Sequence, residues 1–164
     1  MESLKDRVDE LFKDKKMSVV QAAAKLKVPE YEILSLRGGE EFKEVSGSKL
    51  DEVLKDLESW GELIFCKNTP DFIMEFKVKV GKVANDNGYY NFSCKSGFLG
   101  GHLKEDSVKK IGFVCTTFMG MLGYSVHFYN EKHETIFKFY ITRDENMLLN
   151  QTQIKKFEAL KKRL

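Results

Sequence analysis

The sequence predicts an α+β fold, in which a small N-terminal helical bundle precedes a largely antiparallel β-sheet domain with a C-terminal helix. Two patterns lead to this prediction. Apolar residues recur at helical spacing over residues 1–58, and from Glu62 onward they alternate with polar residues in short aromatic and β-branched runs. Almost no helical pattern interrupts these runs until Asn150, so the strands follow one another without helical crossovers. We therefore predict a helical segment over residues 1–58 and an antiparallel sheet domain over residues 59–164.

The helical segment is marked by its apolar faces and its helix ends. Ser18 is placed to cap a helix, Pro29 stands at the start of the next, and the Gly38-Gly39 pair ends that one. The predicted helices cover residues 4–12, 19–26, 29–38 and 49–57. The second and third resemble a helix-turn-helix, a motif that reads DNA with basic or amide side chains at the start of its second helix. Because Glu30 and Glu32 stand there and repel phosphate, we expect this pair to be a scaffold.

The second part of the chain contains seven short strand-like runs and an amphipathic tail. The runs are ELIFCKNT, DFIMEFKVKVG, GYYNFSC, GGHLKED, KKIGFVCTTF, YSVHFYN and ETIFKFYITRD. ANDNG at 84–88 and NEKHE at 130–134 are typical hairpin connections, so we expect an antiparallel meander. In the tail, Ile154, Phe157 and Leu160 lie on one helical face, which we expect to cover the sheet.

Composition limits the compartment and the partners. The chain has 164 residues, enough for a core that needs no disulfide or metal. Its 27 basic residues nearly balance 25 acidic ones, so a net charge of +2 gives no argument for nucleic-acid binding. No run approaches the about 18 apolar residues that span a bilayer, and the three cysteines form no CxxC pair. We expect a reduced, cytoplasmic protein without membrane insertion.

Common enzyme motifs are absent, and three histidines remain as candidates. There is no GxSxG elbow, P-loop, HExxH motif or paired-histidine metal spacing. His127 lies within a strand-like run and is expected to be a surface or partly buried residue. His133 lies in a predicted turn and is expected to be exposed to solvent. We therefore concentrate on His102.

His102 follows two glycines in SGFLGGHLKED, residues 96–106. Two successive glycines indicate either a sharp turn or the close approach of a large flat ligand to the backbone. Strand alternation places His102 and Lys104 on the same face. An imidazole beside an ammonium suits a ligand with a metal centre and peripheral carboxylates, which describes heme. An ordinary strand histidine is the alternative.

Four stretches resemble a known family in order and approximate spacing. They are WGELIFCKNTPDFIMEF, GYYNFSCKSGFLGGHLKED, KKIGFVCTTFMGMLGYSVHFYN and IFKFYITRDE. Nearly the whole chain is similar to the bacterial heme-utilisation carriers of the HutX/ChuX type. The resemblance implies a cytosolic homodimer that takes heme b as cargo after import and stores it or hands it on. Its paired sheets would resemble the two fused halves of the larger HemS-type heme proteins, and a heme importer or a heme-degrading enzyme would be a partner.

The resemblance also implies site residues. His102 matches the GGH histidine of the family and is the candidate axial ligand of the iron. Where family members can carry a second histidine this chain has Asn68, a poor iron ligand, so the iron is either five-coordinate or takes water, Met119 or Met121 as its sixth ligand. The remaining candidates for heme contact are Lys104, Phe118, Met119, Met121 and Arg143.

Two of these assignments keep a structural alternative. Phe118 and the two methionines of FMGM form either an adaptable wall for the ring or ordinary core. Arg143 pairs either with a heme propionate or with a neighbouring acidic residue, Asp144 or Glu145. The predicted function is a non-enzymatic heme carrier. A ring-opening heme enzyme and a heme-responsive DNA-binding regulator are the alternatives.

Overall fold

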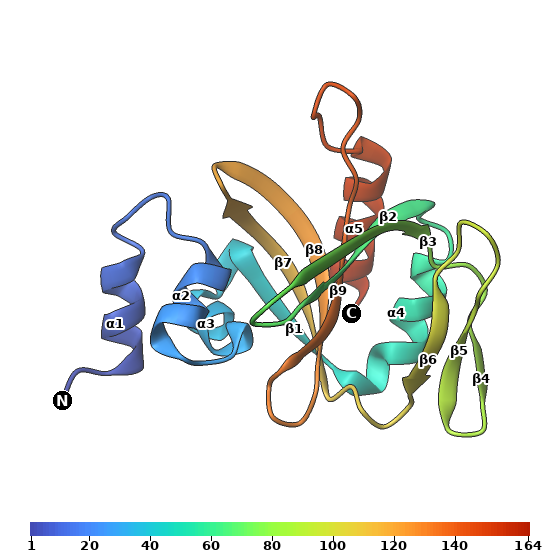
Figure 1. Cartoon of the computed structure of the whole chain (residues 1–164), viewed down its shortest axis with the longest axis horizontal. Helices are drawn as coiled ribbons and strands as arrows, with labels where there is room; N and C mark the ends of the chain where they lie inside the picture. The colour runs from blue at the N-terminus through green and yellow to red at the C-terminus, as the bar shows by residue number, and fades with distance from the viewer.

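A six-stranded antiparallel sheet, in the order β1-β7-β8-β9-β2-β3, forms the centre of the computed structural model, which describes residues 1–164 (Figure 1). A smaller sheet, in the order β4-β5-β6, continues beyond β3. Backbone hydrogen bonds join the two, since Lys79 bonds to Gly97 and Leu99 over 3.0 and 2.8 Å. The strands are β1 Phe42–Ser46, β2 Glu62–Asn68, β3 Ile73–Lys79, β4 Ala84–Asp86, β5 Tyr89–Ser93, β6 Gly100–Lys104, β7 Lys110–Phe118, β8 Met121–Tyr129 and β9 Thr135–Tyr140.

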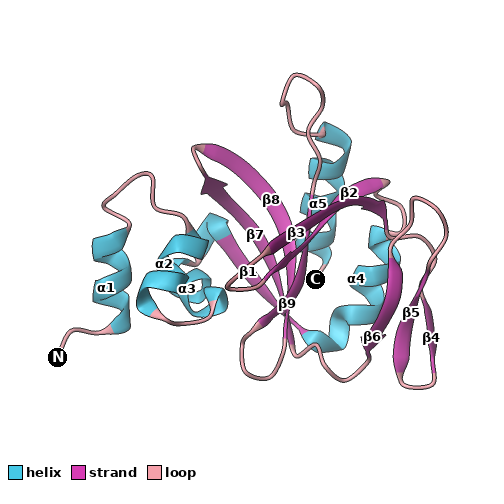
Figure 2. Ribbon diagram, in the orientation of Figure 1, coloured by secondary structure: helices cyan, strands magenta, loops and turns pink.

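Five helices accompany the sheets. They are α1 Leu4–Leu11, α2 Val19–Leu26, α3 Glu30–Arg37, α4 Leu50–Leu57 and α5 Gln151–Arg163. The side chain of Ser18 accepts a hydrogen bond from the backbone of Gln21 and so caps α2, as predicted. Gly38 ends α3 with a φ of 53°. In Figure 2, α1, α2 and α3 form one group at the end of the molecule opposite the small sheet.

Each face of the large sheet carries its own apolar core. On one face, α4, α5 and the small sheet pack against strand residues that include Phe113, Val126 and Phe139. Phe157 of α5 lies at this contact, with ring centroids 5.4 Å from Phe113 and 5.3 Å from Tyr124. On the other face, α1, α2 and α3 pack in a smaller cluster that includes Phe42, Val114 and Tyr129 of the strands. The C-terminal helix therefore covers the sheet as predicted.

The predicted α+β class is confirmed, and two details of the prediction are wrong. β1 was not predicted, because a short, charged FKEVS run between helices has little strand signal of its own. The strands also do not form one meander, since β2 lies beside β9 and β1 lies beside β7. An alternating pattern identifies strands but does not fix their partners. The predicted division at residue 58 runs between elements that share one core, because Val45 and Leu54 pack with the sheet.

Two hairpins turn through two residues in the left-handed region. Asn87 and Gly88 have φ values of 54° and 80° and join β4 to β5, within the predicted ANDNG connection. Met119 and Gly120 have φ values of 51° and 78° and join β7 to β8. Such pairs of positive φ values match the twist of antiparallel strands. Gly120 is therefore explained by the turn, and the turn exposes the methionine beside it.

Candidate functional site

His102 lies on β6, the edge strand of the small sheet, with its side chain on the outer face. His102 and Lys104 are exposed, whereas Leu103 between them is buried, 6% exposed, in the main core. The alternation predicted for this strand is thus confirmed. Lys104 is 3.8 Å from Asp106, and more than half of its side chain is open to solvent. An imidazole and an ammonium therefore share one accessible face.

Asn91 of β5 orients the His102 ring. The two residues are register partners, and His102 Nδ1 lies 2.6 Å from Asn91 Oδ1. The Asn91 amide nitrogen faces the backbone oxygens of Ala84, Asp86 and Tyr89 at 3.3–3.4 Å. Since that nitrogen is committed to acceptors, Asn91 Oδ1 accepts a hydrogen bond from Nδ1–H of His102. The free lone pair then lies on Nε2 of this exposed ring, the arrangement in which a histidine binds a metal.

The two glycines before His102 have different structural reasons. A Cβ on Gly100 would stand 2.4 Å from Cys94 Sγ, so this glycine allows the chain to pass close to the preceding loop. Gly101 has a φ of 127°, and a Cβ there would meet nothing within 4 Å. The space beside the backbone at Gly101 is therefore open, next to the imidazole. Neither glycine makes a sharp turn, since both lie within β6, and the approach of a flat ligand at Gly101 stays a prediction.

A single imidazole, that of His102, is suited to a metal that is already held by other ligands. No group of three or more His, Cys, Asp and Glu side chains is arranged to hold a metal ion. A single imidazole is a weak site for a bare ion. In heme, the porphyrin supplies four nitrogens and the protein needs to add only an axial one. His102 therefore fits heme iron better than it fits a free cation.

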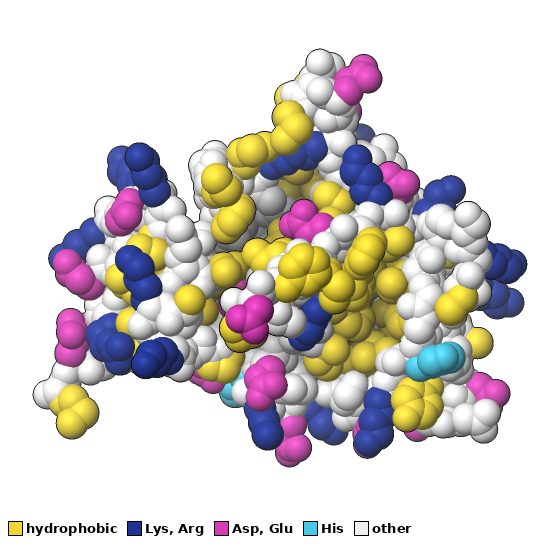
Figure 3. Space-filling model, in the orientation of Figure 1, with side chains coloured by type: hydrophobic (Ala, Val, Ile, Leu, Met, Phe, Trp, Pro, Cys, Tyr) yellow, Lys and Arg dark blue, Asp and Glu magenta, His cyan; other side chains and the backbone are white.

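Apolar side chains are also exposed along the β2–β3 hairpin. Figure 3 shows hydrophobic atoms gathered in a hollow between the β2–β3 hairpin and β6. On the hairpin, Phe72, Ile73 and Phe76 are 52–63% exposed. Large apolar residues at this exposure, along an edge strand, are unusual on a monomer surface. They provide a surface that a flat apolar ligand or another protein surface can cover.

The other predicted contact residues lie at the β7–β8 hairpin turn. Phe118 is 50% exposed and Met119 is 81% exposed, and Met121 faces Phe118 across the hairpin. This turn and β6 are at opposite sides of the molecule in Figure 1. One chain therefore brings Phe118, Met119 and Met121 together with one another but not with His102.

Arg143 joins the hairpin turn to the loop that follows β9. Its guanidinium donates hydrogen bonds to the carbonyl oxygens of Leu122 and Met147, the second at 2.8 Å. It forms no ion pair with Asp144 or Glu145, so that structural alternative is wrong. Asn68, at the end of β2, accepts a hydrogen bond from Cys66 Sγ over 3.0 Å.

The expectations for the other two histidines were wrong. His127 is 3% exposed, and its ring nitrogens lie 2.8 Å from Ser125 Oγ and 2.9 Å from the Tyr129 hydroxyl. Burial, together with the charge of Lys138, holds the pKa of His127 well below its usual value. His133 is half-buried, 2.6 Å from Glu32 of α3. The strand pattern could not show that α2 and α3 would cover this face of the sheet.

The same contacts bear on the helix-turn-helix resemblance. Glu30 and Glu32, at the start of α3, contact Lys138 of β9 and His133 in the β8–β9 turn. The helix start that would have to enter a DNA groove is thus packed against the sheet. These contacts agree with a scaffold role for the helix pair.

Sequence reasoning missed Asn91, Glu30 and Lys138 as candidate functional residues. Asn91 meets His102 only through the β5–β6 register, which the loop between those strands does not fix. Glu30 and Lys138 are 108 residues apart and meet only in the folded chain. No local pattern marked this pair, because alternation places Lys138 on the face opposite Phe137 and Phe139, where a lysine is expected to be solvated.

Comparison with known proteins places the chain among heme-utilisation proteins. The family model described as Haem utilisation ChuX/HutX matches residues 43–160. The intracellular heme transport protein HutX of Vibrio cholerae serotype O1 (strain ATCC 39315 / El Tor Inaba N16961) is 31% identical over 161 residues, which cover 98% of this chain and 83% of that protein. None of the helices here is both long and apolar enough to cross a bilayer.

Solved structures share the whole fold. A protein from Erwinia carotovora superposes with a TM-score of 0.89 at 27% identity, covering 100% of this chain and 99% of its own. The heme-binding protein ChuX superposes with a TM-score of 0.83, covering 96% of this chain and 97% of its own. At 23% identity the likeness to ChuX concerns the fold alone.

Proposed function

The chain belongs to the Haem utilisation ChuX/HutX family, and from this premise we propose that it is an intracellular heme carrier. It binds heme reversibly and passes it to another protein. The relative from Vibrio cholerae is an intracellular heme transport protein, and similarity to it extends over nearly the whole chain. The observation that carries the proposal is the oriented, accessible imidazole of His102, whose Nδ1 is held by Asn91.

In this proposal His102 Nε2 is the axial ligand, and the cargo is heme b. Burial of the ring contributes most of the affinity, at about 25 cal/mol per Å2 of apolar surface, while the iron–nitrogen bond fixes orientation. Lys104, on the same face, is available to a propionate. A carrier in the cytoplasm receives heme from an importer and releases it to storage or to a heme-degrading enzyme.

We also propose that the carrier is a homodimer. β3 is the last strand of the large sheet and bonds to the chain before β6 only at Lys79, so the rest of its edge is open. Ile73 and Phe76 of this strand, and Phe72 just before it, are exposed. An exposed apolar edge is a hazard in a monomer and a typical contact in a dimer. A second copy of the chain can cover this edge, because it presents the same apolar side chains to it.

A hemin titration tests the ligand assignment. Absorption and native mass are recorded together for the wild type, His102→Ala and the control His133→Ala, which alters a histidine bonded to Glu32. We expect about one heme per chain and a Soret band for the wild type and the control. His102→Ala should bind at least about tenfold more weakly, with a shifted band, because it loses the iron–nitrogen bond. A tenfold loss corresponds to about 1.4 kcal/mol. An unchanged spectrum and affinity in His102→Ala would remove this ligand.

A further inference from the structure

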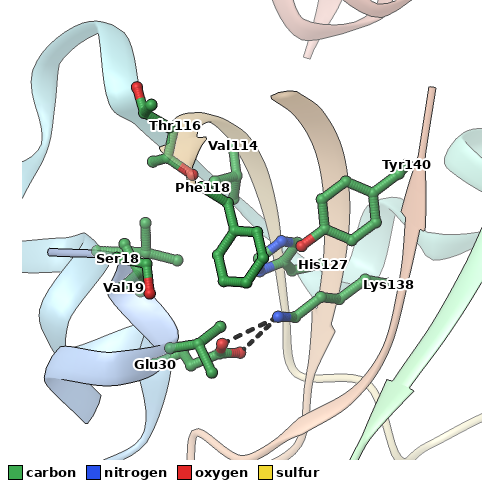
Figure 4. A pocket seen from close by; sticks show the side chains of 12 residues that line it. Ser18, Val19, Glu30, Val114, Thr116, Phe118, His127, Lys138 and Tyr140 are labelled. Carbon is green, nitrogen blue, oxygen red and sulfur yellow. Dashed lines mark hydrogen bonds and ion pairs between the residues drawn. The ribbon is translucent and has the colours of Figure 1, made fainter. Parts of the chain in front are cut away.

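A narrow cleft, lined by both apolar and polar side chains, lies between the N-terminal helices and the large sheet. It measures about 30 Å3, which is room for about two water molecules or one carboxylate group. Its lining comes from α2, α3, β7, β8 and β9. In Figure 4 the side chains of Lys138 and Glu30 meet within it, with His127 and Tyr140 beside them and the Phe118 ring above. Phe118 is half exposed, so the cleft opens towards the β7–β8 hairpin turn.

The cleft contains a buried ion pair. Lys138 Nζ lies 2.8 and 3.0 Å from the two carboxylate oxygens of Glu30, and the two side chains are 3% and 13% exposed. Burial opposes the charge of Lys138, but Tyr140 and Glu30 outweigh it and raise the pKa of Lys138 above its ordinary value. His127 is kept neutral by its lowered pKa. The ammonium of Lys138 is thus the one positive charge in the cleft, and it requires an anion beside it.

A buried ion pair of this kind is weak evidence for stability. Two apolar residues of similar size often stabilise a protein equally well, because the pair must be removed from water. Removing one partner, in contrast, leaves an unpaired buried charge. Exchanging one carboxylate for another avoids that cost, since the ammonium remains paired throughout. Glu30 is the first residue of α3, directly after Pro29, so its side chain can rotate towards solvent without a change in the helix.

We propose that Lys138 binds a carboxylate of the carried porphyrin, and that Glu30 occupies this position as an internal substitute until the ligand arrives. The inference rests on the proposed heme-carrier function and adds a second contact point for the cargo. The dimensions agree with it, because the cleft admits a carboxylate-sized group but no ring. Phe118 and Met121 at its opening provide the apolar contact that the ring next to that carboxylate needs.

The placement also sets a condition on His102. Lys138 lies in the middle of the large sheet, whereas His102 lies on the outer face of the small sheet. A single porphyrin therefore meets both residues only if they come from two copies of the chain. This condition agrees with the homodimer proposed above.

Two ligands that differ only in their carboxylates test the proposal. The full-length wild type, Lys138→Gln and Glu30→Gln are titrated with hemin and with hemin dimethyl ester. We expect Lys138→Gln to bind hemin about tenfold more weakly and the ester as the wild type does. Glu30→Gln removes the competing carboxylate, so it should bind hemin severalfold more tightly and the ester unchanged.

Controls separate this role from a structural one. Lys110→Gln interrupts another ion pair, with Glu44 at 3.4 Å, and should shift neither ligand. Where Lys138→Gln does not fold, the double variant Glu30→Met with Lys138→Met replaces both charges and should bind the two ligands equally. Equal shifts for hemin and ester, or no shift in either, would show that the pair is only structural. If the wild type binds hemin and the ester equally well, the role of Lys138 is overturned but the carrier function is not. If it binds neither of them, the carrier function is overturned too.

Discussion

At the scale of single residues, His102 and His127 show what a local pattern can and cannot predict. Period-two alternation within β6 is local, so it correctly assigns His102 to an exposed face and Leu103 to the core. The burial of His127 depends on α2 and α3, which lie about a hundred residues earlier in the chain and cover that face of the sheet. The exposure of a histidine was therefore predictable where its own strand decides it. It was not predictable where a distant element covers the strand.

His127 should make stability sensitive to acid. Burial lowers the pKa of His127 in the folded chain below its ordinary value of 6.5, whereas in the unfolded chain it takes up a proton near pH 6.5. Below that pH the unfolded state binds a proton that the folded state does not. The free energy of unfolding should therefore fall with decreasing pH, by up to about 1.4 kcal/mol per pH unit.

The measurement compares urea unfolding of the wild type and His127→Gln between pH 7.5 and about 5. Glutamine keeps hydrogen-bonding capacity towards Ser125 and Tyr129 but does not titrate. The carboxylates contribute equally to both proteins, so the difference between the two curves isolates the histidine. Parallel curves would mean that His127 is protonated in the folded state as well.

At the scale of elements, the helices with strong periodicity were predicted and the short edge strand was not. α4 and α5 bury their apolar faces where the pattern placed them, with Leu57, Phe157 and Leu160 fully buried. β1 becomes a strand because β7 offers it an open edge, with Phe42 paired to Val114. A strand of this kind is determined by its neighbour rather than by its own composition.

The packing of α5 should depend strongly on Phe157. Its ring contacts Trp60, Phe113 and Tyr124 edge to face, and the residue is 0% exposed. Phe157→Ala should lower the free energy of unfolding by about 3–5 kcal/mol, because it leaves a cavity among rings that cannot close around it. Urea unfolding measures the change, and Lys155→Ala on the exposed side of the helix serves as the control. A loss below about 1 kcal/mol would mean that the helix is not held by this face.

At the scale of the whole molecule, the predicted site residues fall into two groups that a monomer keeps apart. The family resemblance named them together, and no local pattern could assign them to one copy or to two. His102 and Lys104 lie on the small sheet, and Phe118, Met119 and Met121 lie at the β7–β8 turn with Arg143 behind them. A homodimer is the simplest assembly in which both groups can contact one ligand.

The β3 edge should carry the dimer contact. In sedimentation, the wild type is expected to have twice the mass of the 19.0 kDa chain. The double variant Ile73→Lys with Phe76→Lys places like charges across a two-fold contact and should be monomeric. Met147→Lys changes another apolar residue, 55% exposed, away from this edge and should remain dimeric. A dimeric double variant would mean that the contact lies elsewhere.

If one porphyrin is shared between two copies, the two defective variants should complement each other. A dimer of His102→Ala with Lys138→Gln, co-expressed with two tags and purified through both, contains one site with His102 and Lys138 intact and one site with neither. We expect it to bind one hemin per dimer with wild-type affinity and wild-type preference over the dimethyl ester, because the intact histidine and lysine come from different chains. If both residues served the ligand from the same chain, each half of the mixed dimer would carry one defect, and every site would bind as weakly as the corresponding single variant. A titration of the mixed dimer beside the two parent variants distinguishes these outcomes, since only a shared site produces a tight phase with half of the normal stoichiometry.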